Sequence, residues 1–106
     1  MSAEFKTVWA EPLTEFCQRV FEKMGISPED AFTTAEVLVL ADLRGIDSHG
    51  VARLRRYYTG LKSGVMVPKP QMKVAHETPI TALLDGGAAL GQVAGKRGME
   101  MAIEKA

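Results

Sequence analysis

Hydrophobic positions near the start of the chain recur at helical spacing. The apolar residues Leu13, Phe16, Cys17, Val20, Phe21 and Met24 are three or four residues apart, and Gly25 follows them. This spacing is typical of an amphipathic helix, and a glycine directly after the last apolar position is a common helix end. We therefore predict a first helix over residues 13–24. Ahead of it, the run from Lys6 to Trp9 predicts a short strand.

Two further helices are predicted before residue 66. Ser27 can cap a helix, Pro28 suits its first turn, and Glu29 and Asp30 complement the positive end of its dipole. The later half of this second helix, residues 37–43, is apolar almost all round, which indicates that another part of the protein or a second subunit covers it. A third helix is predicted from about residue 51 to residue 62, ending at a Ser-Gly pair ahead of "VPKP".

The pattern changes in the second half of the chain. The stretches "MKVAHE" and "ITALLDG" alternate or are continuously apolar, as strands are, and Thr78 and Pro79 join them. A last helix is predicted from near Leu90. We therefore predict an α+β fold. An N-terminal layer of three helices, residues 1–66, precedes a β-hairpin and a further helix in residues 67–106, the start of a mixed α/β domain.

Composition and charge narrow the classes of protein that the chain can represent. It has 106 residues, of which 46% are hydrophobic and 25% charged, and its formal net charge is zero. A neutral chain has no general attraction for nucleic acid or an acidic membrane, so we expect neither as a partner. Its longest apolar run, residues 37–41, is far shorter than the roughly 20 residues that cross a bilayer. The first residues have no basic region followed by an apolar run, so a cytoplasmic location is expected.

Residues that could bind a metal or react as thiols are few. Cys17 lies on the apolar side of the first helix, where a free cysteine packs as a small hydrophobe, so we expect a core position in a reducing compartment. With one cysteine and two distant histidines, no metal site is predicted, and His76 is expected to be a half-exposed strand residue. The glycines of "GQVAGKR" match neither a phosphate-binding loop nor a dinucleotide fingerprint.

The stretch "GIDSHG", residues 45–50, interrupts two predicted helices and presents Ser48 and His49, with Arg53 four residues after the histidine. Residues four apart on a helix have Cβ atoms about 5–6 Å apart. An anion there would meet the positive end of the helix, free backbone N–H groups and a guanidinium. If Arg53 held a carboxylate, an adjacent carbonyl oxygen would lie within reach of His49, the usual type of general acid and base. The spacing therefore fits a small 2-oxo or 2-hydroxy acid.

The same residues have a simpler interpretation. Asp47 or Ser48 could cap the third helix while His49 lies on the surface and Arg53 is solvated. Ser48 is the most ambiguous residue, because one hydroxyl could serve a helix cap or a substrate. Spacing alone leaves both interpretations open.

Four segments, in the same order, match a known family: "EDAFTTAEVLVLADLRGIDSHGVARLRRYYTGLKSG", "VPKP", "ETPITALLDGG" and "LGQVAGKRGMEMAIEKA". The most specific part is "ADLRGIDSHGVARL". Together they resemble the malate/L-lactate dehydrogenase family that is distinct from the Rossmann-type lactate and malate dehydrogenases. This family includes ureidoglycolate, sulfolactate, diketogulonate and cyclic-imine reductases.

The resemblance implies an oxidoreductase that uses NAD or NADP to interconvert a 2-hydroxy acid such as malate or lactate and its 2-oxo acid. It implies that His49 is the acid–base residue, that Arg53 holds the substrate carboxylate and that Ser48 lines the site. It also implies a homodimer whose sites draw on both subunits. Family members are much longer than this chain, so we expect the N-terminal fragment of a larger non-Rossmann fold, inactive alone, with most cofactor-binding residues after Ala106.

Two other functions stay open from the sequence. The apolar second helix and the strip of small residues in the last helix favour a non-catalytic helical oligomerisation module. The basic residues of the third helix could belong to a helix-turn-helix module for nucleic acid, although zero net charge disfavours it.

Overall fold

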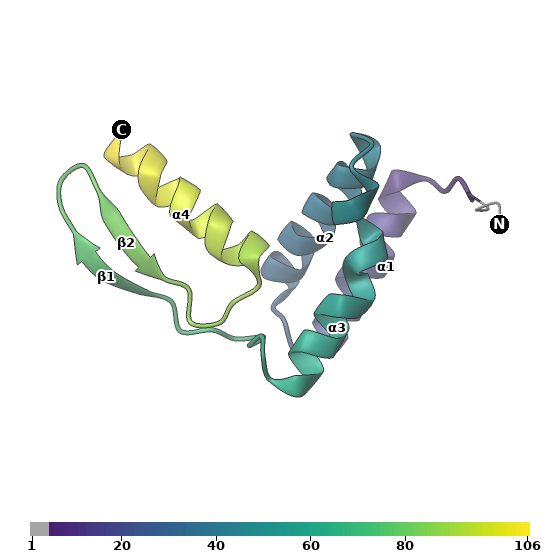
Figure 1. The fold of residues 1–106 in the computed structure, drawn as a ribbon, viewed down its shortest axis with the longest axis horizontal. Helices are drawn as coiled ribbons and strands as arrows, with labels where there is room; N and C mark the ends of the chain where they lie inside the picture. Colours follow the sequence, from purple (N-terminus) through teal and green to yellow (C-terminus); the bar gives the residue numbers. More distant parts are fainter. Residues whose placement is uncertain (1–4) are drawn as a thin grey trace.

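The structure, a computed structural model, describes residues 5–106. Its elements in chain order are α1 (Ala10–Lys23), α2 (Pro28–Leu43), two 3₁₀ turns η1 (Asp47–His49) and η2 (Val51–Arg53), α3 (Leu54–Ser63), β1 (Lys73–Glu77), β2 (Ala82–Asp85) and α4 (Gly91–Lys105). The first three α-helices form one side of the molecule, and the hairpin with α4 forms the other (Figure 1). The predicted α+β fold, with a helical layer followed by a hairpin and a further helix, is confirmed.

Local sequence signals set the ends of α1, α2 and α3. The Ser27 hydroxyl accepts a hydrogen bond from the Asp30 backbone N–H at 3.2 Å, which caps α2 as predicted. Gly25 and Gly64 follow α1 and α3 with φ of +94° and +84°, a left-handed conformation that glycine adopts without a steric penalty. These contacts are local, so the sequence pattern was sufficient to predict them.

Two predicted elements differ from the structure. The run from Lys6 to Trp9 is not a strand, because the sheet found within residues 5–106 is the two-stranded hairpin and these residues have no neighbouring strand. The third α-helix begins at Leu54 instead of Val51, because the Arg53 N–H bonds the Gly50 carbonyl three residues earlier, as in a 3₁₀ turn. His49 therefore lies in a separate turn ahead of the helix.

The hydrophobic core lies among the helices. Phe21 and Leu38 are fully buried, and the Phe21 ring meets Tyr57 of α3 edge to face at 6.3 Å between centroids. The core cluster comprises Cys17, Phe21, Ile26, Ala31, Ala35, Leu38, Leu61, Leu90 and Val93. Two of these, Leu90 and Val93, come from the start of α4, so both halves of the chain share one core. Phe16, assigned to the same apolar face of α1, is 57% exposed.

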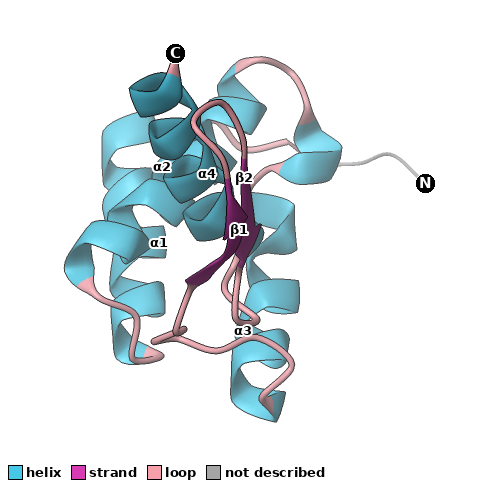
Figure 2. Cartoon of the chain, turned by 90° about the vertical axis from the view of Figure 1, so that its left-hand side faces the viewer, coloured by secondary structure: helices cyan, strands magenta, loops and turns pink. Residues whose placement is uncertain are grey.

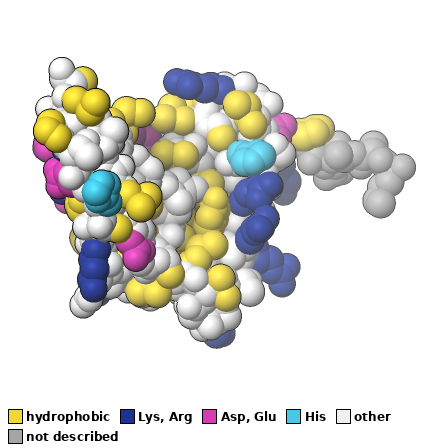
Figure 3. All heavy atoms as spheres, turned by 60° about the vertical axis from the view of Figure 1, so that its left-hand side comes forward, with side chains coloured by type: hydrophobic (Ala, Val, Ile, Leu, Met, Phe, Trp, Pro, Cys, Tyr) yellow, Lys and Arg dark blue, Asp and Glu magenta, His cyan; other side chains and the backbone are white. Residues whose placement is uncertain are grey.

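The molecule is open instead of spherical. Its radius of gyration is 15.5 Å, against about 13 Å for a compact domain of this length. The helices α1–α3 and the hairpin diverge from the contact between α2 and α4 (Figure 1). Seen from the hairpin side, β1 and β2 lie in front of the helices (Figure 2). Hydrophobic side chains are visible on the surface between the two sides (Figure 3). The apolar part of α2 that was predicted to be covered is covered only in part within this chain: Leu38 and Val39 are buried, whereas Leu43 is 65% exposed.

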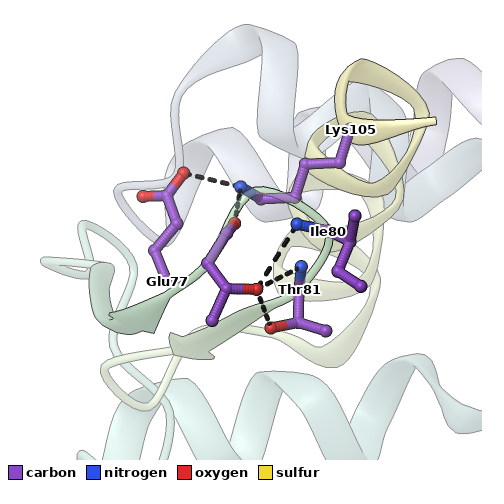
Figure 4. A network of polar contacts seen from close by, with 5 residues as sticks. Glu77, Ile80, Thr81 and Lys105 are labelled. Carbon is purple, nitrogen blue, oxygen red and sulfur yellow. Dashed lines mark hydrogen bonds and ion pairs between the residues drawn. The ribbon is translucent and has the colours of Figure 1, made fainter.

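A polar network ties the hairpin to the end of α4 (Figure 4). The strands pair antiparallel, with Glu77 opposite Ala82 and an irregularity between Val74 and His76. The Lys105 ammonium donates hydrogen bonds of 2.8 Å to the Glu77 carboxylate and to the Thr78 carbonyl. The hydrogen bond from Lys105, and secondly its positive charge, lower the pKa of Glu77.

The fully buried side chain of Leu38 should dominate the stability of the helical layer. Leu38→Ala is expected to lower the free energy of unfolding by about 2–5 kcal/mol, since it removes apolar contacts and leaves a cavity. Leu40 lies on the same helix but is 40% exposed, so Leu40→Ala should lower the free energy of unfolding by roughly half as much or less. Urea denaturation followed by circular dichroism measures both, and equal losses would contradict the core described above.

The lowered pKa of Glu77 predicts a pH-dependent contribution to stability. Because folding lowers this pKa, the contribution is complete above the ordinary value of 4.5 and is lost as the pH falls through the lowered value. The difference in unfolding free energy between the unchanged chain and Glu77→Gln should therefore shrink in acid. Glu104→Gln, an exposed carboxylate of α4, is the matched control. A Glu77→Gln difference that is constant between about pH 7 and pH 2 would be the opposite result.

Candidate functional site

The segment between α2 and α3 presents the three residues that the sequence singled out. Gly45, with φ of +78°, turns the chain away from α2, and η1 then places Ser48 and His49 at the surface. Gly50 is buried and separates η1 from η2, which ends at Arg53. Both turns are short and 3₁₀, so His49 and Arg53 are not four apart on one α-helix as the sequence predicted.

Ser48 nevertheless connects the histidine to the arginine. Its hydroxyl lies 2.8 Å from His49 Nδ1, and its backbone carbonyl accepts a hydrogen bond from Arg53 Nε. The first contact orients the imidazole and involves Nδ1, so the second ring nitrogen, Nε2, is the one available to another group. The second contact uses Nε and leaves the terminal nitrogens of the guanidinium, which make no hydrogen bond to residues 5–106.

One predicted source of attraction for an anion is absent. The sequence predicted free N–H groups at the start of the third helix, but the Val51 N–H donates to the Asp42 carboxylate at 2.9 Å. A carboxylate already lies at that positive helix end, so an anion would be repelled there. Attraction for an anion near His49 therefore depends on the Arg53 guanidinium, which can bind a carboxylate through two parallel hydrogen bonds.

The simpler interpretation of the loop is right about the surface position of His49 but wrong about the helix cap. Neither Asp47 nor Ser48 makes a side-chain cap on η1, η2 or α3. The Ser48 hydroxyl is directed to His49 instead, and the capping carboxylate comes from Asp42 of the preceding helix. The ambiguity over Ser48 is thereby reduced, because its hydroxyl is not used as a helix cap.

Asp42 is the residue that sequence reasoning missed. It lies in the last turn of α2, where the helix dipole favours a cation, and that turn has no basic residue. An acidic residue in this position was the signal that could have indicated a specific partner. Its charge also reaches the core: burial, and secondly the charge of Asp42, raise the pKa of the Cys17 thiol. Cys17 is buried, which confirms its predicted core position.

A polar contact outside the loop joins α3 to α4. The Gln92 side-chain N–H donates to the Tyr57 hydroxyl at 2.9 Å, while Gln92 Oε1 is buried without a hydrogen-bond partner in the described part of the chain. Tyr57 is one helical turn after Arg53, so this contact fixes the start of α4 near the helix that follows the loop. This contact between Gln92 and Tyr57 was not predicted from the sequence.

Other candidate features were located outside the loop. His76 is exposed and lies on β1, which is on the opposite side of the molecule from α1, α2 and α3. Within residues 5–106, no three His, Cys, Asp or Glu side chains come together as a metal ion would require. No helix in that range is long and apolar enough to cross a membrane.

The surroundings of the loop are basic on one side and apolar on another. Lys and Arg side chains gather beside a histidine on the helical side of the molecule (Figure 3), and α3 contributes Arg55, Arg56 and Lys62. A surface cavity of about 490 Å³ reaches the other side of the loop, where it is lined by Asp42, Asp47 and apolar residues such as Leu43. Ser48, His49 and Arg53 do not line that cavity.

Comparisons with known proteins agree on one family. The family described as malate/L-lactate dehydrogenase matches residues 8–106. The chain is 52% identical over 87 residues to an L-sulfolactate dehydrogenase of Methanocaldococcus jannaschii, covering 82% of the chain and 25% of that protein. It is 50% identical over 94 residues to a malate dehydrogenase of Pyrococcus horikoshii, covering 89% of the chain and 26% of that protein. An Escherichia coli ureidoglycolate dehydrogenase (NAD(+)) is 40% identical over 96 residues, which cover 91% of the chain and 28% of the enzyme.

Solved structures give the same result. The malate dehydrogenase of Pyrococcus horikoshii superimposes with a TM-score of 0.93 at 47% identity, over 94% of this chain and 29% of that one. The sulfolactate dehydrogenase of Methanocaldococcus jannaschii gives a TM-score of 0.89 at 47% identity, over 91% and 28% of the two chains. The chain thus spans about a quarter of the length of these relatives.

Proposed function

The chain belongs to the malate/L-lactate dehydrogenase family, and we propose that it is the part of such an enzyme that binds and protonates the substrate. The substrate is a small 2-hydroxy acid, such as malate, lactate or sulfolactate, or the corresponding 2-oxo acid. The observation that supports this most is the double use of Ser48, which ties the imidazole of His49 and the guanidinium of Arg53 to one residue. An acid–base group and a carboxylate-binding group are what this substrate class requires.

Arg53 is the proposed carboxylate-binding residue. Its Nε is held by the Ser48 carbonyl, so the guanidinium plane is oriented before substrate arrives and its terminal nitrogens can form a bidentate pair. In a 2-oxo acid the carbonyl carbon is bonded directly to the carboxylate carbon. Fixing the carboxylate therefore also fixes the position of the carbonyl oxygen, which lowers the entropic cost of reaching the reactive geometry.

His49 is the proposed acid and base. With Nδ1 in contact with the Ser48 hydroxyl, Nε2 is free to donate a proton to the carbonyl oxygen in reduction and to remove the hydroxyl proton in oxidation. The nicotinamide cofactor, NAD or NADP, supplies the hydride in one direction and accepts it in the other. We assign none of the described residues to the cofactor and expect its binding residues in other parts of the enzyme.

The same proposal gives roles to the two parts of the chain. Residues 1–66 provide the substrate-binding segment, and residues 67–106 begin a mixed α/β domain. The accessible apolar residues of α2, with Leu43 65% exposed, fit burial against the rest of the enzyme or a second subunit of a homodimer. The oligomerisation role considered from the sequence is compatible with this arrangement.

Removal of the imidazole should abolish most turnover without loss of the cofactor. In the full-length enzyme that contains this chain, His49→Ala is expected to lower kcat for 2-oxo acid reduction by about 10²–10⁴-fold, the usual contribution of a general acid. The dissociation constant of the nicotinamide cofactor, measured by fluorescence titration, should stay unchanged. His76→Ala on β1 is the matched control and should keep normal rates. A His49→Ala enzyme with normal kcat would reject the assignment.

Removal of the guanidinium should act on binding of the substrate carboxylate. Arg53→Ala is expected to raise KM for the 2-oxo acid by about 10–100-fold, since a charge-assisted hydrogen bond contributes about 1.5–3 kcal/mol. The 2-oxo amide, which lacks the carboxylate charge, should be affected far less. Arg55→Ala, an exposed neighbour on α3, controls for loss of general positive charge. If KM rises equally for the 2-oxo acid and the 2-oxo amide in Arg53→Ala, the carboxylate is bound elsewhere.

A further inference from the structure

The carboxylate of Asp42 occupies a position that an isolated helix would disfavour. Asp42 is in the last turn of α2, where unpaired backbone carbonyls give the helix its negative end. That turn contains no basic residue to balance the charge. The carboxylate must therefore be compensated by donors from outside its own helix.

The compensating donor belongs to the loop that contains His49. Asp42 Oδ2 accepts a hydrogen bond of 2.9 Å from the N–H of Val51, the first residue of η2. η2 continues directly into α3, so residues 51–63 form one helical run whose positive end faces this carboxylate. Gly50, the residue before η2, has no side chain that could make the cap. Asp42, nine positions before Val51, makes the cap instead.

Gly50 shows that this contact is closely packed. Gly50 is buried, and a Cβ atom at this position would overlap the Asp42 carboxylate. Its φ of −95° lies outside the left-handed region that favours glycine, so the close approach of the Asp42 carboxylate is the feature that favours glycine here. The Asp42 carboxylate therefore occupies the space that a side chain on residue 50 would need. This close packing fixes the path of the chain between η1 and η2.

We propose that Asp42 is a positioning residue for His49 and Arg53. It touches neither side chain. It acts by holding the Val51 N–H, which fixes η2 relative to α2 and so keeps Arg53 Nε against the Ser48 carbonyl. Ser48 in turn contacts Nδ1 of His49. The proposal rests on the function proposed above, because it gives Asp42 a role in placing the acid–base group and the carboxylate-binding group.

The packing part of this proposal is tested without activity. Thermal unfolding of the full-length enzyme is measured for Gly50→Ala, for Asp42→Ala and for the double variant. Gly50→Ala should lower Tm clearly when Asp42 is present, and should lower it much less in the Asp42→Ala background, where the methyl group has space. An equal loss of Tm in both backgrounds would overturn the contact.

Hydrogen exchange tests the same contact at the loop. By mass spectrometry of a peptide covering residues 47–54, Asp42→Ala should raise exchange at the loop at least about tenfold, because the Val51 N–H loses its acceptor. Asp42→Asn keeps a carbonyl oxygen and should raise it less. Glu36→Ala, an exposed carboxylate of the same helix, should leave it unchanged. Equal exchange in Asp42→Ala and Glu36→Ala would also overturn the contact.

Kinetics test the positioning role itself. Asp42→Ala should lower kcat and raise KM for the 2-oxo acid, each by about tenfold, with cofactor affinity unchanged, and Asp42→Asn should restore part of both. In an Arg53→Ala background, Asp42→Ala should raise KM little further, since the group being positioned is absent. A purely structural role would lower Tm and the active fraction while KM stays normal, and that result overturns the proposal.

The two proposals fail in different ways. If His49→Ala turns over normally, the proposed function fails and the positioning role fails with it, whatever the loop exchange shows. If His49→Ala is inactive while Asp42→Ala has normal kcat and KM, the function stands and only the role of Asp42 is rejected.

Discussion

Burial of α2 is the interaction on which the rest of the structure depends. Its fully buried apolar residues, Ala31, Ala35 and Leu38, contribute to a core that α1, α3 and the start of α4 complete. Small alanine side chains let the neighbouring helices approach closely, and Leu38 fills the remaining space. Because Leu90 and Val93 join this core, the hairpin and α4 are attached to the helical layer through the same helix. The direction of α2 therefore determines where both halves of the chain lie.

The same helix has two different ends. Its first turn is capped by Ser27 and has acidic residues, which match the positive end of the helix. Its last turn has Asp42, whose charge is compensated by the start of the next helical run instead of by its own. The two helical ends are thus joined through one carboxylate. The loop between them has little regular structure, but specific polar contacts hold it in place. A preorganised binding site needs this combination.

Much of the apolar surface of this chain is accessible. Leu43 and Ile46 at the loop are at least half exposed, and the residues of both hairpin strands are exposed apart from the half-buried Leu84. A single 106-residue segment with this shape buries less than a compact domain would. The relatives are about four times as long. In the function proposed for this chain, its exposed apolar regions fit burial against the rest of the enzyme or a second subunit. The proposed site lies beside such a region, so its walls are only partly built by these residues.

Most of the helices and strands, and the residues of the loop, could be predicted from local sequence patterns. Spacing of apolar positions predicted α1, the Ser27 cap predicted the start of α2, and alternation predicted the hairpin, because each depends on neighbours within a few residues. The stretch "GIDSHG" and the spacing to Arg53 likewise indicated Ser48, His49 and Arg53 as one group, and Ser48 does contact both of the others. The roles of these three residues in catalysis are our proposal.

Contacts between residues far apart in the sequence could not be predicted from local patterns and are seen only in the tertiary structure. The run from Lys6 to Trp9 has strand-like composition but no neighbouring strand, and strand formation requires one. The α-helix α3 starts at Leu54 after a 3₁₀ turn, and the start of that turn contacts a carboxylate that is adjacent in space but not in sequence. In the sequence, the position of Asp42 in the last turn of a helix could indicate a specific partner, but it does not identify that partner. Its importance appears only when α2 and the following loop fold against each other, because hydrogen bonds and steric overlap depend on distance in space and not along the chain.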